Sequence, residues 1–332
     1  MVRWAAAIAL GLPGAGWAAE CAPFADPVLD LAFASRYVAD DDTSSEIDPE
    51  RKAEAEASLK PLDSFIANLA DRTDSAIETG DRAAAACVLA ELASWAEADA
   101  LSDLGTQTVE LTIGSRLAAL ALVAGQVAPA GQPEDFSAVS RWLTRRMDAQ
   151  MTFWENAPSG SAQGNLRAWA ALAGAAVALV TDDAVARGWA AWSVSYVACT
   201  ANPDGSLPQE MIRGRLALHY QLHAVAPLTV AAALLEQQGT SVMDKCDRAL
   251  DRVVEFTLAD IAADGAASAA RTGEPQSLTG GLSALKDFQL SWSEAWLRLR
   301  ANPVLEAAIA PRRPLRYSKL GGDQTRIWQI PP

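Results

Sequence analysis

Histidine is almost absent from this chain, which contains two histidines among 332 residues. A metal centre built from several histidines is therefore disfavoured, and the chain has no His-Glu-x-x-His pattern. It also lacks the glycine-rich loop that cradles phosphates and the glycine fingerprint of dinucleotide-binding folds. We therefore expect a protein that needs no metal ion and no other cofactor.

Basic residues are the minority among the charged ones. The chain has 27 Lys and Arg against 41 Asp and Glu, which leaves a formal net charge of −14 at pH 7. Nucleic acids and anionic membranes bind basic surfaces, so neither is an expected partner. The same charge disfavours an acidic polymer as substrate unless the basic side chains gather at one site.

The N-terminus is typical of a secretory signal peptide. Arg3 precedes an apolar run over residues 4–12, and the small residues at 16–19 offer a cleavage site. The run is too short to anchor the chain in a bilayer. We therefore expect a signal peptide over 1–19 and an exported protein, periplasmic or secreted, without membrane insertion.

Four cysteines form an even set, which is typical of an oxidising compartment. Their spacing matches no zinc pattern. A Cys21–Cys87 disulfide would tie the extended N-terminus to a helix, and a Cys199–Cys246 disulfide would join two neighbouring helices. The sequence alone leaves three pairings open.

Abundant alanine and few β-branched runs favour helices over strands. No segment shows a convincing strand alternation, and 265–275 is expected to be a flexible loop. Helix-loop-helix units of roughly 40 residues suggest an all-α, incomplete toroid of antiparallel helix pairs, with an irregular bundle as the alternative. Nothing marks a boundary within 20–332, which predicts one domain. The predicted helices are 49–70, 81–100, 106–127, 133–155, 163–180, 183–201, 208–223, 226–238, 241–263 and 278–299.

The stretch 207–223 concentrates side chains suited to chemistry. Arg213 and Tyr220 are seven positions apart, about two helical turns, which predicts that both point to one side of a helix. The only two histidines, His219 and His223, flank Tyr220. Such a helix could bind an acidic sugar and move its proton. An amphipathic helix with solvated arginines and a core tyrosine is the alternative.

Several motifs, in their order and spacing, carry a resemblance that spans most of the mature chain. They are Cys21-Ala22-Pro23, Ser35-Arg36-Tyr37, Cys87-Val88-Leu89 through Ser94-Trp95-Ala96, Asn165-Leu166-Arg167-Ala168-Trp169-Ala170-Ala171, Asp204-Gly205-Ser206-Leu207-Pro208-Gln209-Glu210 through Tyr220, and Leu320-Gly321-Gly322-Asp323 with Thr325-Arg326. With them the chain resembles the all-helical bacterial alginate lyases, the periplasmic poly-mannuronate lyases. The resemblance implies a helical toroid that cleaves an acidic polysaccharide by β-elimination without a cofactor.

The resemblance also implies site residues. The family's catalytic asparagine, arginine and tyrosine fall on Asn165, Arg213 and Tyr220, whereas its catalytic histidine falls on Leu166. Asn165 and Arg213 would neutralise the sugar carboxylate, and Tyr220 would remove the C5 proton and return one to the leaving oxygen. Arg36, where the family has a lysine, would hold the carboxylate of a neighbouring sugar.

Leucine at position 166 can neither move a proton nor bind a carboxylate, and it leaves three alternatives. Tyr220 alone serves as base and acid on a substrate whose proton and leaving group lie on one face, as in a mannuronate-type linkage. His223 replaces the missing group. Or turnover is lost, and the chain binds polysaccharide as part of an exopolysaccharide export machinery.

Three further residues are candidates for substrate binding. Arg167 could add an anion contact, or be a solvated arginine. Arg215 lies in the same stretch as Tyr220, and Trp169 is the candidate sugar platform, although a place in the core is expected for it. The tail over 311–322 is basic and forms either a surface patch or a return to the cleft. The expected substrate is a 1,4-linked uronan containing mannuronate or glucuronate.

Overall fold

Helices make up most of the described chain, as its abundant alanine predicts. The computed structural model describes residues 21–41 and 43–329, and the predicted signal peptide lies outside the described residues. The longer helices are α1 (Pro49–Thr79), α2 (Arg82–Glu97), α4 (Gly114–Val127), α5 (Pro133–Glu155), α6 (Asn165–Thr181), α7 (Ala184–Cys199), α9 (Ala217–Gln237) and α10 (Ala249–Ala262). The shorter ones are α3 (Gln107–Thr112), α8 (Pro208–Met211), α11 (Ala266–Thr272), α12 (Gly281–Ala284), α13 (Asp287–Leu290), α14 (Ser293–Leu299), α15 (Pro303–Ile309) and α16 (Gln324–Gln329).

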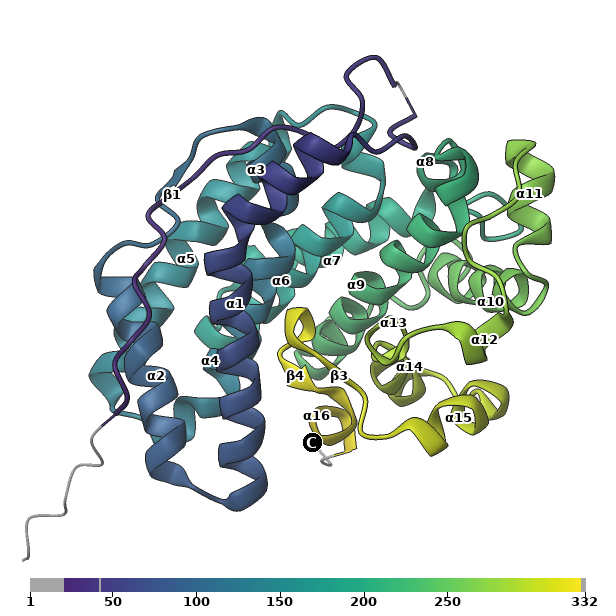
Figure 1. Ribbon diagram of the computed structural model, residues 1–332. Helices are drawn as coiled ribbons and strands as arrows, with labels where there is room; N and C mark the ends of the chain where they lie inside the picture. The colour runs from purple at the N-terminus through teal and green to yellow at the C-terminus, as the bar shows by residue number, and fades with distance from the viewer. Residues whose placement is uncertain (1–20, 42, 330–332) are drawn as a thin grey trace, which may run out of the picture.

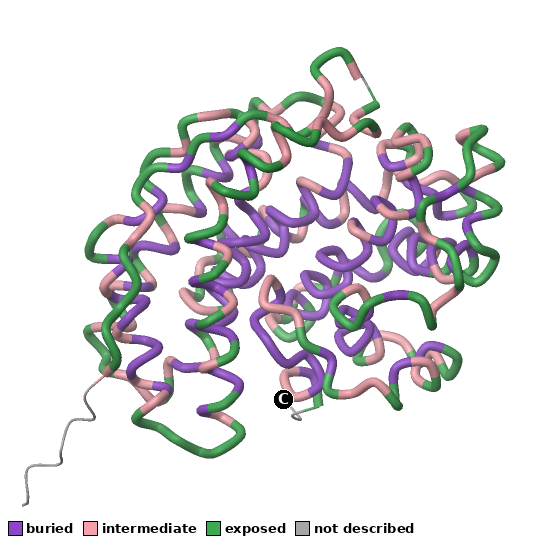
Figure 2. Tube along the Cα trace, in the orientation of Figure 1, coloured by how far each residue is buried: buried purple, intermediate pink, exposed green. Residues whose placement is uncertain are grey.

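The helices follow one another as antiparallel pairs around an open ring (Figure 1). Two residues join α1 to α2 and two join α6 to α7, and such short connections force neighbouring helices to run in opposite directions. Helix α6 packs against α4, α7 and α9 and lies in the most buried part of the molecule (Figure 2). The expected incomplete all-α toroid of helix pairs is confirmed.

Strands are confined to four two-residue segments in the part of the chain described. Strand β1 (Asp30–Leu31) pairs in parallel with β2 (Asp103–Leu104), which lays the extended N-terminal segment along the outside of the helices. Strand β3 (Arg316–Tyr317) pairs antiparallel with β4 (Gly322–Asp323). The turn between β3 and β4 is the 3₁₀ helix η5 (Ser318–Leu320), so this hairpin carries the basic tail back to the ring.

Small residues allow α4 and α6 to pack closely. A Cβ atom added at Gly114 would lie 2.7 Å from the backbone nitrogen of Ala170, so only glycine fits there without moving a helix. The neighbouring α4 positions Ala118 and Ala121 are fully buried, as are Ala171 and Ala173 of α6. The abundant alanine of the sequence is thus a packing requirement at the centre of the ring as well as a helix signal.

The prediction of one helix over 208–223 and another over 226–238 was wrong. Helix α8 ends at Met211, Gly214 adopts a φ of +52° that favours glycine, and α9 then runs unbroken through Pro227. Proline removes one hydrogen bond from a helix interior. Nearly every residue of α9 beyond Tyr220 is buried, and this packing outweighs the lost hydrogen bond.

Other boundaries also differ from the prediction, and the helix expected over 49–70 continues to Thr79. The helix expected over 106–127 is divided into α3 and α4 at Ile113. The helix expected from 241 begins only at Ala249, because residues 246–248 all adopt positive φ angles. The helix expected over 278–299 is divided into α12, α13 and α14, and the loop expected over 265–275 contains α11.

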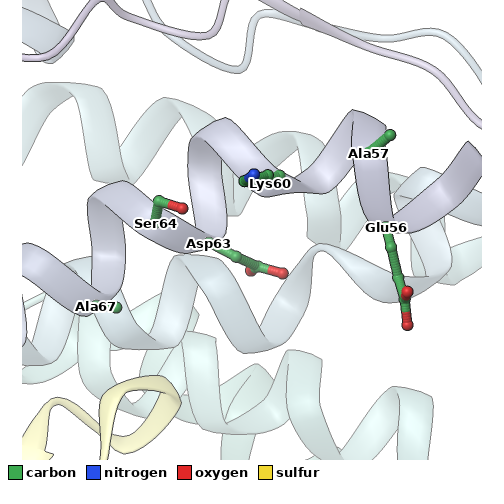
Figure 3. A pocket seen from close by; sticks show the side chains of 6 residues that line it. All are labelled: Glu56, Ala57, Lys60, Asp63, Ser64 and Ala67. Atoms are coloured by element: carbon green, nitrogen blue, oxygen red, sulfur yellow. The ribbon is translucent and has the colours of Figure 1, made fainter. Parts of the chain in front are cut away.

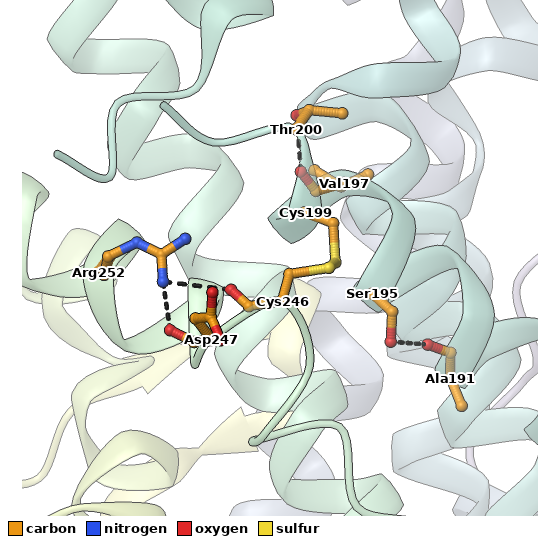
Figure 4. The surroundings of a disulfide bond; sticks show 8 residues. All are labelled: Ala191, Ser195, Val197, Cys199, Thr200, Cys246, Asp247 and Arg252. Atoms are coloured by element: carbon orange, nitrogen blue, oxygen red, sulfur yellow. Dashed lines mark hydrogen bonds between the residues drawn. A yellow bond between two sulfur atoms is a disulfide. The ribbon is translucent and has the colours of Figure 1, made fainter. Parts of the chain in front are cut away.

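Both expected disulfides are present, Cys21–Cys87 and Cys199–Cys246. The second joins the last residue of α7 to the left-handed turn before α10, where Arg252 donates hydrogen bonds to the carbonyls of Cys246 and Asp247 (Figure 4). The stretch Gly214–Gln237 has the length and hydropathy of a membrane span, but 89% of its most apolar window is buried inside the protein, as in a core helix.

The contact at Gly114 predicts opposite effects for two glycine substitutions in helices. Gly114→Ala should lower the free energy of unfolding by about 1–3 kcal/mol, because its methyl group meets the backbone of α6. Gly188 in α7 has open space where a Cβ atom would lie. Gly188→Ala should therefore leave the free energy of unfolding unchanged or raise it by up to about 1 kcal/mol. Urea titration measures both, and equal effects would contradict the packing account.

Candidate active site

Helices α6 and α9 bring the predicted residues to one end of the ring. The Trp169 indole of α6 donates to Nε2 of His223 in α9 at 3.0 Å, and further along Gln238 donates to the carbonyl of Ala175. Both helices therefore run in the same direction. Asn165, one turn before Trp169, and Tyr220, one turn before His223, thus lie at the same end of the pair.

Tyr220 forms a half-buried cluster with Arg36, Tyr37 and Arg213, which we name the Tyr220 cluster. Nη2 of Arg36 donates to the Tyr220 hydroxyl at 2.8 Å and to the Tyr37 hydroxyl at 3.1 Å. The two tyrosine hydroxyls are themselves hydrogen-bonded. A cationic donor at the phenol oxygen favours the phenolate over the neutral phenol. The cluster is therefore suited to take a proton at the Tyr220 oxygen.

Arg213 reaches Tyr220 by a different route from the one the sequence predicted. It lies in the turn between α8 and α9, not two turns before Tyr220 on a continuous helix. Its guanidinium carbon lies 3.7 Å from the centre of the Tyr220 ring and 5.1 Å from that of Tyr37. Its Nε and Nη2 donate to the backbone carbonyl of Ser44, at 3.1 and 2.6 Å. Arg36 and Tyr37 thus contact Tyr220, and the backbone of Ser44 contacts Arg213.

Asn165 is held by a buried carboxyl group. Its backbone N–H and its side-chain Nδ2 donate to the two oxygens of Glu210, at 2.6 and 2.9 Å. Burial raises the pKa of Glu210 to about 7, against the opposing effects of the Asn165 hydrogen bonds and the charge of Arg213. Glu210 thereby connects α6 to the helix that precedes Arg213.

Both histidines of the protein lie beside Tyr220. The rings of His219 and His223 lie 5.1 and 6.2 Å from the Tyr220 ring, edge to face. Burial lowers the pKa of His223 well below its usual value, and burial together with Arg36 and Arg213 lowers that of His219. Both imidazoles are therefore neutral at neutral pH. His223 already accepts the Trp169 hydrogen bond, whereas His219 makes no hydrogen bond within the described residues.

Lys319, from η5 in the basic tail, adds a third positive charge at this end of the ring. It acts electrostatically on His223, and Arg36 and Arg116 act on it in turn. Burial, followed by the charge of Arg116, lowers the pKa of Lys319 to about 8. Within the described residues the Lys319 ammonium has neither an ion pair nor a hydrogen bond. The basic tail therefore returns to the site, which was one of the two alternatives that its sequence left open.

Arg36 and Arg213 also lack an ion pair within the described residues, unlike Arg116, which Asp63 binds through both oxygens at 2.9 Å. Arg36 and Arg213 contact Tyr220, and Lys319 lies at the same end of the ring. None of the three forms an ion pair among the described residues, while Glu210 and Asp63 act on Arg213 and Lys319 from a distance. A net charge of −14 is consequently compatible with a local site for an anion.

Three predicted binding residues do not join the cluster. Arg167 is buried, so it is not a solvated arginine; its guanidinium lies 4.4 Å from the centre of the Trp192 ring and its Nε donates to Ser193. These contacts do not support the predicted anion contact. Trp169 is 3% exposed and has no free face for a sugar; it supports the site through His223. Arg215 is exposed, and no contact joins it to the cluster among the residues described.

A second hollow, separate from the Tyr220 cluster, lies along α1 (Figure 3). It is a poor receptor for a polyanion. It is lined by Glu56, Ala57, Lys60, Asp63, Ser64 and Ala67. Its two carboxylates outnumber the single lysine, so the Tyr220 cluster is the better candidate. No group of three or more potential metal ligands occurs among the residues with described positions.

Sequence reasoning missed four residues of this site. Tyr37 was part of a recognised motif but had no role assigned, and Lys319 was included only as part of the basic tail. The sequence prediction gives His219 no role beyond its place next to Tyr220, whereas it considers His223 as a replacement for the missing catalytic histidine. Glu210 gave the signal of an acid in the first turn of a helix, which says nothing of its contact with Asn165.

Known proteins are similar to this chain over most of its length. A family model described as alginate lyase matches residues 105–267. A polysaccharide lyase from Stenotrophomonas maltophilia is 30% identical over 296 residues, 86% of this chain and 84% of that protein. An alginate lyase from Pseudomonas syringae pv. tomato is 28% identical over 250 residues, 73% of this chain and 65% of that protein.

Solved structures agree on the fold. A variant of alginate lyase A1-III complexed with a tetrasaccharide superposes with a TM-score of 0.79 at 21% identity, covering 94% of this chain and 86% of the other. The A1-III enzyme of Sphingomonas species A1 gives a TM-score of 0.74 at 20% identity, covering 93% and 86%.

The position of Arg167 predicts that its loss affects stability and not catalysis. Arg167→Met should lower the free energy of unfolding by about 1–3 kcal/mol, because its contacts with four aromatic rings are lost. The kcat/KM on a uronan should stay within about threefold of wild type. Arg213→Met is the control, and equal losses of activity in both variants would contradict this placement.

Proposed function

This chain belongs to the alginate lyase family of polysaccharide lyases, and we propose that it cleaves a 1,4-linked uronan of mannuronate or glucuronate by β-elimination at the Tyr220 cluster. The observation that carries the site is the convergence of Tyr220, Arg213 and Arg36 from three separate segments. Within this proposal residues 20–332 form one lyase domain that follows a signal peptide over 1–19.

β-Elimination of a uronate has two chemical requirements. The hydrogen at C5 is weakly acidic while the neighbouring carboxylate is charged, so that charge has to be neutralised as the proton leaves. The oxygen at C4 then departs as the double bond forms between C4 and C5, and it has to receive a proton. The site therefore needs an anion receptor beside a group that takes one proton and gives one back.

Arg213 and Asn165 are the anion receptor in this proposal. Arg213 now donates to the carbonyl of Ser44, and a sugar carboxylate would be a stronger acceptor because its bond to the guanidinium is charge-assisted. Binding thus exchanges the Ser44 carbonyl for the sugar carboxylate as the acceptor of the Arg213 hydrogen bonds. Asn165 keeps one N–H for the carboxylate, since Glu210 occupies the other.

Tyr220 is the proton-transfer group. Arg36 stabilises its phenolate, which can accept the C5 proton and then return a proton to the oxygen at C4. One residue serves both steps where the proton and leaving group lie on the same face of the sugar, as in mannuronate and glucuronate linkages. The reaction then does not require the catalytic histidine that the family has at the position of Leu166.

His223 is a weaker candidate for a second proton-transfer group. Its Nε2 accepts the Trp169 hydrogen bond, and burial holds the ring neutral. His223 is also a substrate-binding candidate by its place beside Tyr220, but in this proposal it supports the site through Trp169 instead of replacing the missing group or binding substrate. Arg36 likewise acts on Tyr220 directly, instead of serving only a neighbouring sugar.

The unpaired cations explain how an acidic protein holds an acidic polymer. Arg36, Arg213 and Lys319 offer successive positive charges to a chain of carboxylates. Two disulfides fit a non-cytoplasmic location, and we propose the periplasm or the exterior. A part in exopolysaccharide export without turnover is the alternative outcome of the experiment below.

Tyr220→Phe tests the proton-transfer role. Losing the phenol oxygen should lower kcat on polymannuronate or polyglucuronate by about 10²–10⁴-fold with little change in KM. The measurement is ultraviolet absorbance of the unsaturated uronate product. Tyr196→Phe, which changes a tyrosine outside the cluster, is the matched control. Polymer binding without product in the wild type, abolished by Arg213→Ala, would instead identify a binding protein.

Lys319 predicts a pH dependence of substrate binding. The pKa of Lys319 is about 8, so its side chain is positively charged below that pH and neutral above it. KM should therefore rise as the pH passes through about 8. Lys319→Arg keeps the charge and should remove this rise, whereas Lys319→Met should raise KM by roughly tenfold at pH 7 and low salt. The exposed Lys286→Met is the control. A pH-independent KM in the wild type would contradict this role.

A further inference from the structure

Glu210 is a fully buried carboxyl group with no access to substrate, and yet both of its oxygens are committed to Asn165. One accepts the backbone N–H of Asn165 at 2.6 Å and the other accepts Nδ2 at 2.9 Å. Burying a carboxyl group costs free energy unless hydrogen bonds compensate for it. A site that retains such a group in its interior uses it for orientation.

The backbone around Asn165 is shaped for this contact. Asn165 is the first residue of α6, and Gly164 before it offers no side chain to cap the helix. Glu210 supplies that cap from 45 positions away. A Cβ atom at Gly164 would lie 2.6 Å from Oε1 of Glu210, so the glycine is what permits the approach.

Hydrogen-bond chemistry determines which end of the Asn165 amide faces Glu210. Above its pKa of about 7 the Glu210 carboxylate accepts and cannot donate, so the amide nitrogen points toward it. The carbonyl oxygen of Asn165 and its second N–H are then fixed in the remaining directions. A free asparagine side chain would exchange these two ends by a half-turn.

We propose that Glu210 is a positioning residue for the elimination reaction, holding the Asn165 amide in the orientation that presents an N–H to the sugar carboxylate. Arg213 follows Glu210 by three residues in the chain, so a single turn sets the place of both groups that receive the carboxylate. This inference rests on the proposed function, because it assigns an orientation to one of that site's own residues.

Glu210→Gln is the sharpest test, because it keeps size and one acceptor. The new Nε2 donates, so Asn165 turns its carbonyl oxygen toward position 210 and reverses the end presented to substrate. We expect kcat to fall by about 10- to 100-fold with KM changed by less than about threefold. Glu91→Gln is the matched control, since Glu91 is also buried and also accepts a backbone N–H, from Ala25.

A double-mutant cycle distinguishes positioning from a general structural role. In an Asn165→Ala background, Glu210→Gln should change kcat by less than about threefold, because no amide remains to be oriented. An equal loss in both backgrounds would show that Glu210 acts elsewhere, and an unchanged kcat in the single variant would overturn the proposal. If Asn165→Ala itself retains full activity, the proposed site is wrong and the positioning role fails with it.

Thermal unfolding at pH 8 tests whether the Glu210→Gln variant is folded. The folded-state pKa of about 7 lies above the ordinary value of 4.5, so the folded protein binds this proton more tightly between those two values. The contribution of Glu210 to stability therefore falls as pH rises through 7. Removing the charge should leave Tm at pH 8 unchanged or higher, which separates lost orientation from lost structure.

Discussion

Helices α6 and α9 pack side by side at the centre of the ring, and the hydrogen bond from Trp169 to His223 sets their relative position. Because both helices run the same way, their first turns meet at one end. Glycine and alanine on α4 and α6 allow α4 to pack closely on the other side of α6. The packing that supports the site thus depends on how small these residues are.

Charge is distributed unevenly in this protein. Most of the arginines that pack between elements are paired with carboxylates, as Arg313 is with Glu294 and Glu306. Around Tyr220 the pattern is reversed, since none of the ion pairs of the described chain includes Arg36, Arg213 or Lys319. An excess of acid elsewhere repels a polyanion from other surfaces and leaves one place where its approach is favourable.

Helix content and the ring of helix pairs could be predicted from the sequence, because they depend on periodicity and short connections. The even set of cysteines predicts two disulfides, but it leaves three pairings open, and the structure decides among them. The turn between α8 and α9 could not be predicted. Seven-residue spacing placed Arg213 and Tyr220 on one face of a helix, whereas the structure brings them together across a turn that Gly214 permits. Spacing reports local geometry only. The contacts of Glu210 with Asn165, and of Lys319 with the charges around Tyr220, join positions far apart in the chain, and neither has a local signal.

The segment that carries Arg36 and Tyr37 has a position unlike the rest of the site. It is fastened upstream by the Cys21–Cys87 disulfide, and Leu31 and Phe33 just before it are buried in the core. Arg36 donates to the hydroxyl of Tyr220, and the carbonyl of Ser44 accepts from Arg213. Arg36 is exposed and Tyr37 is partly exposed, so substitutions at these two positions change what surrounds the reacting sugar while the buried side chains before them stay in place. In evolutionary terms, new substrate preferences are accessible at these two positions with little change to the core.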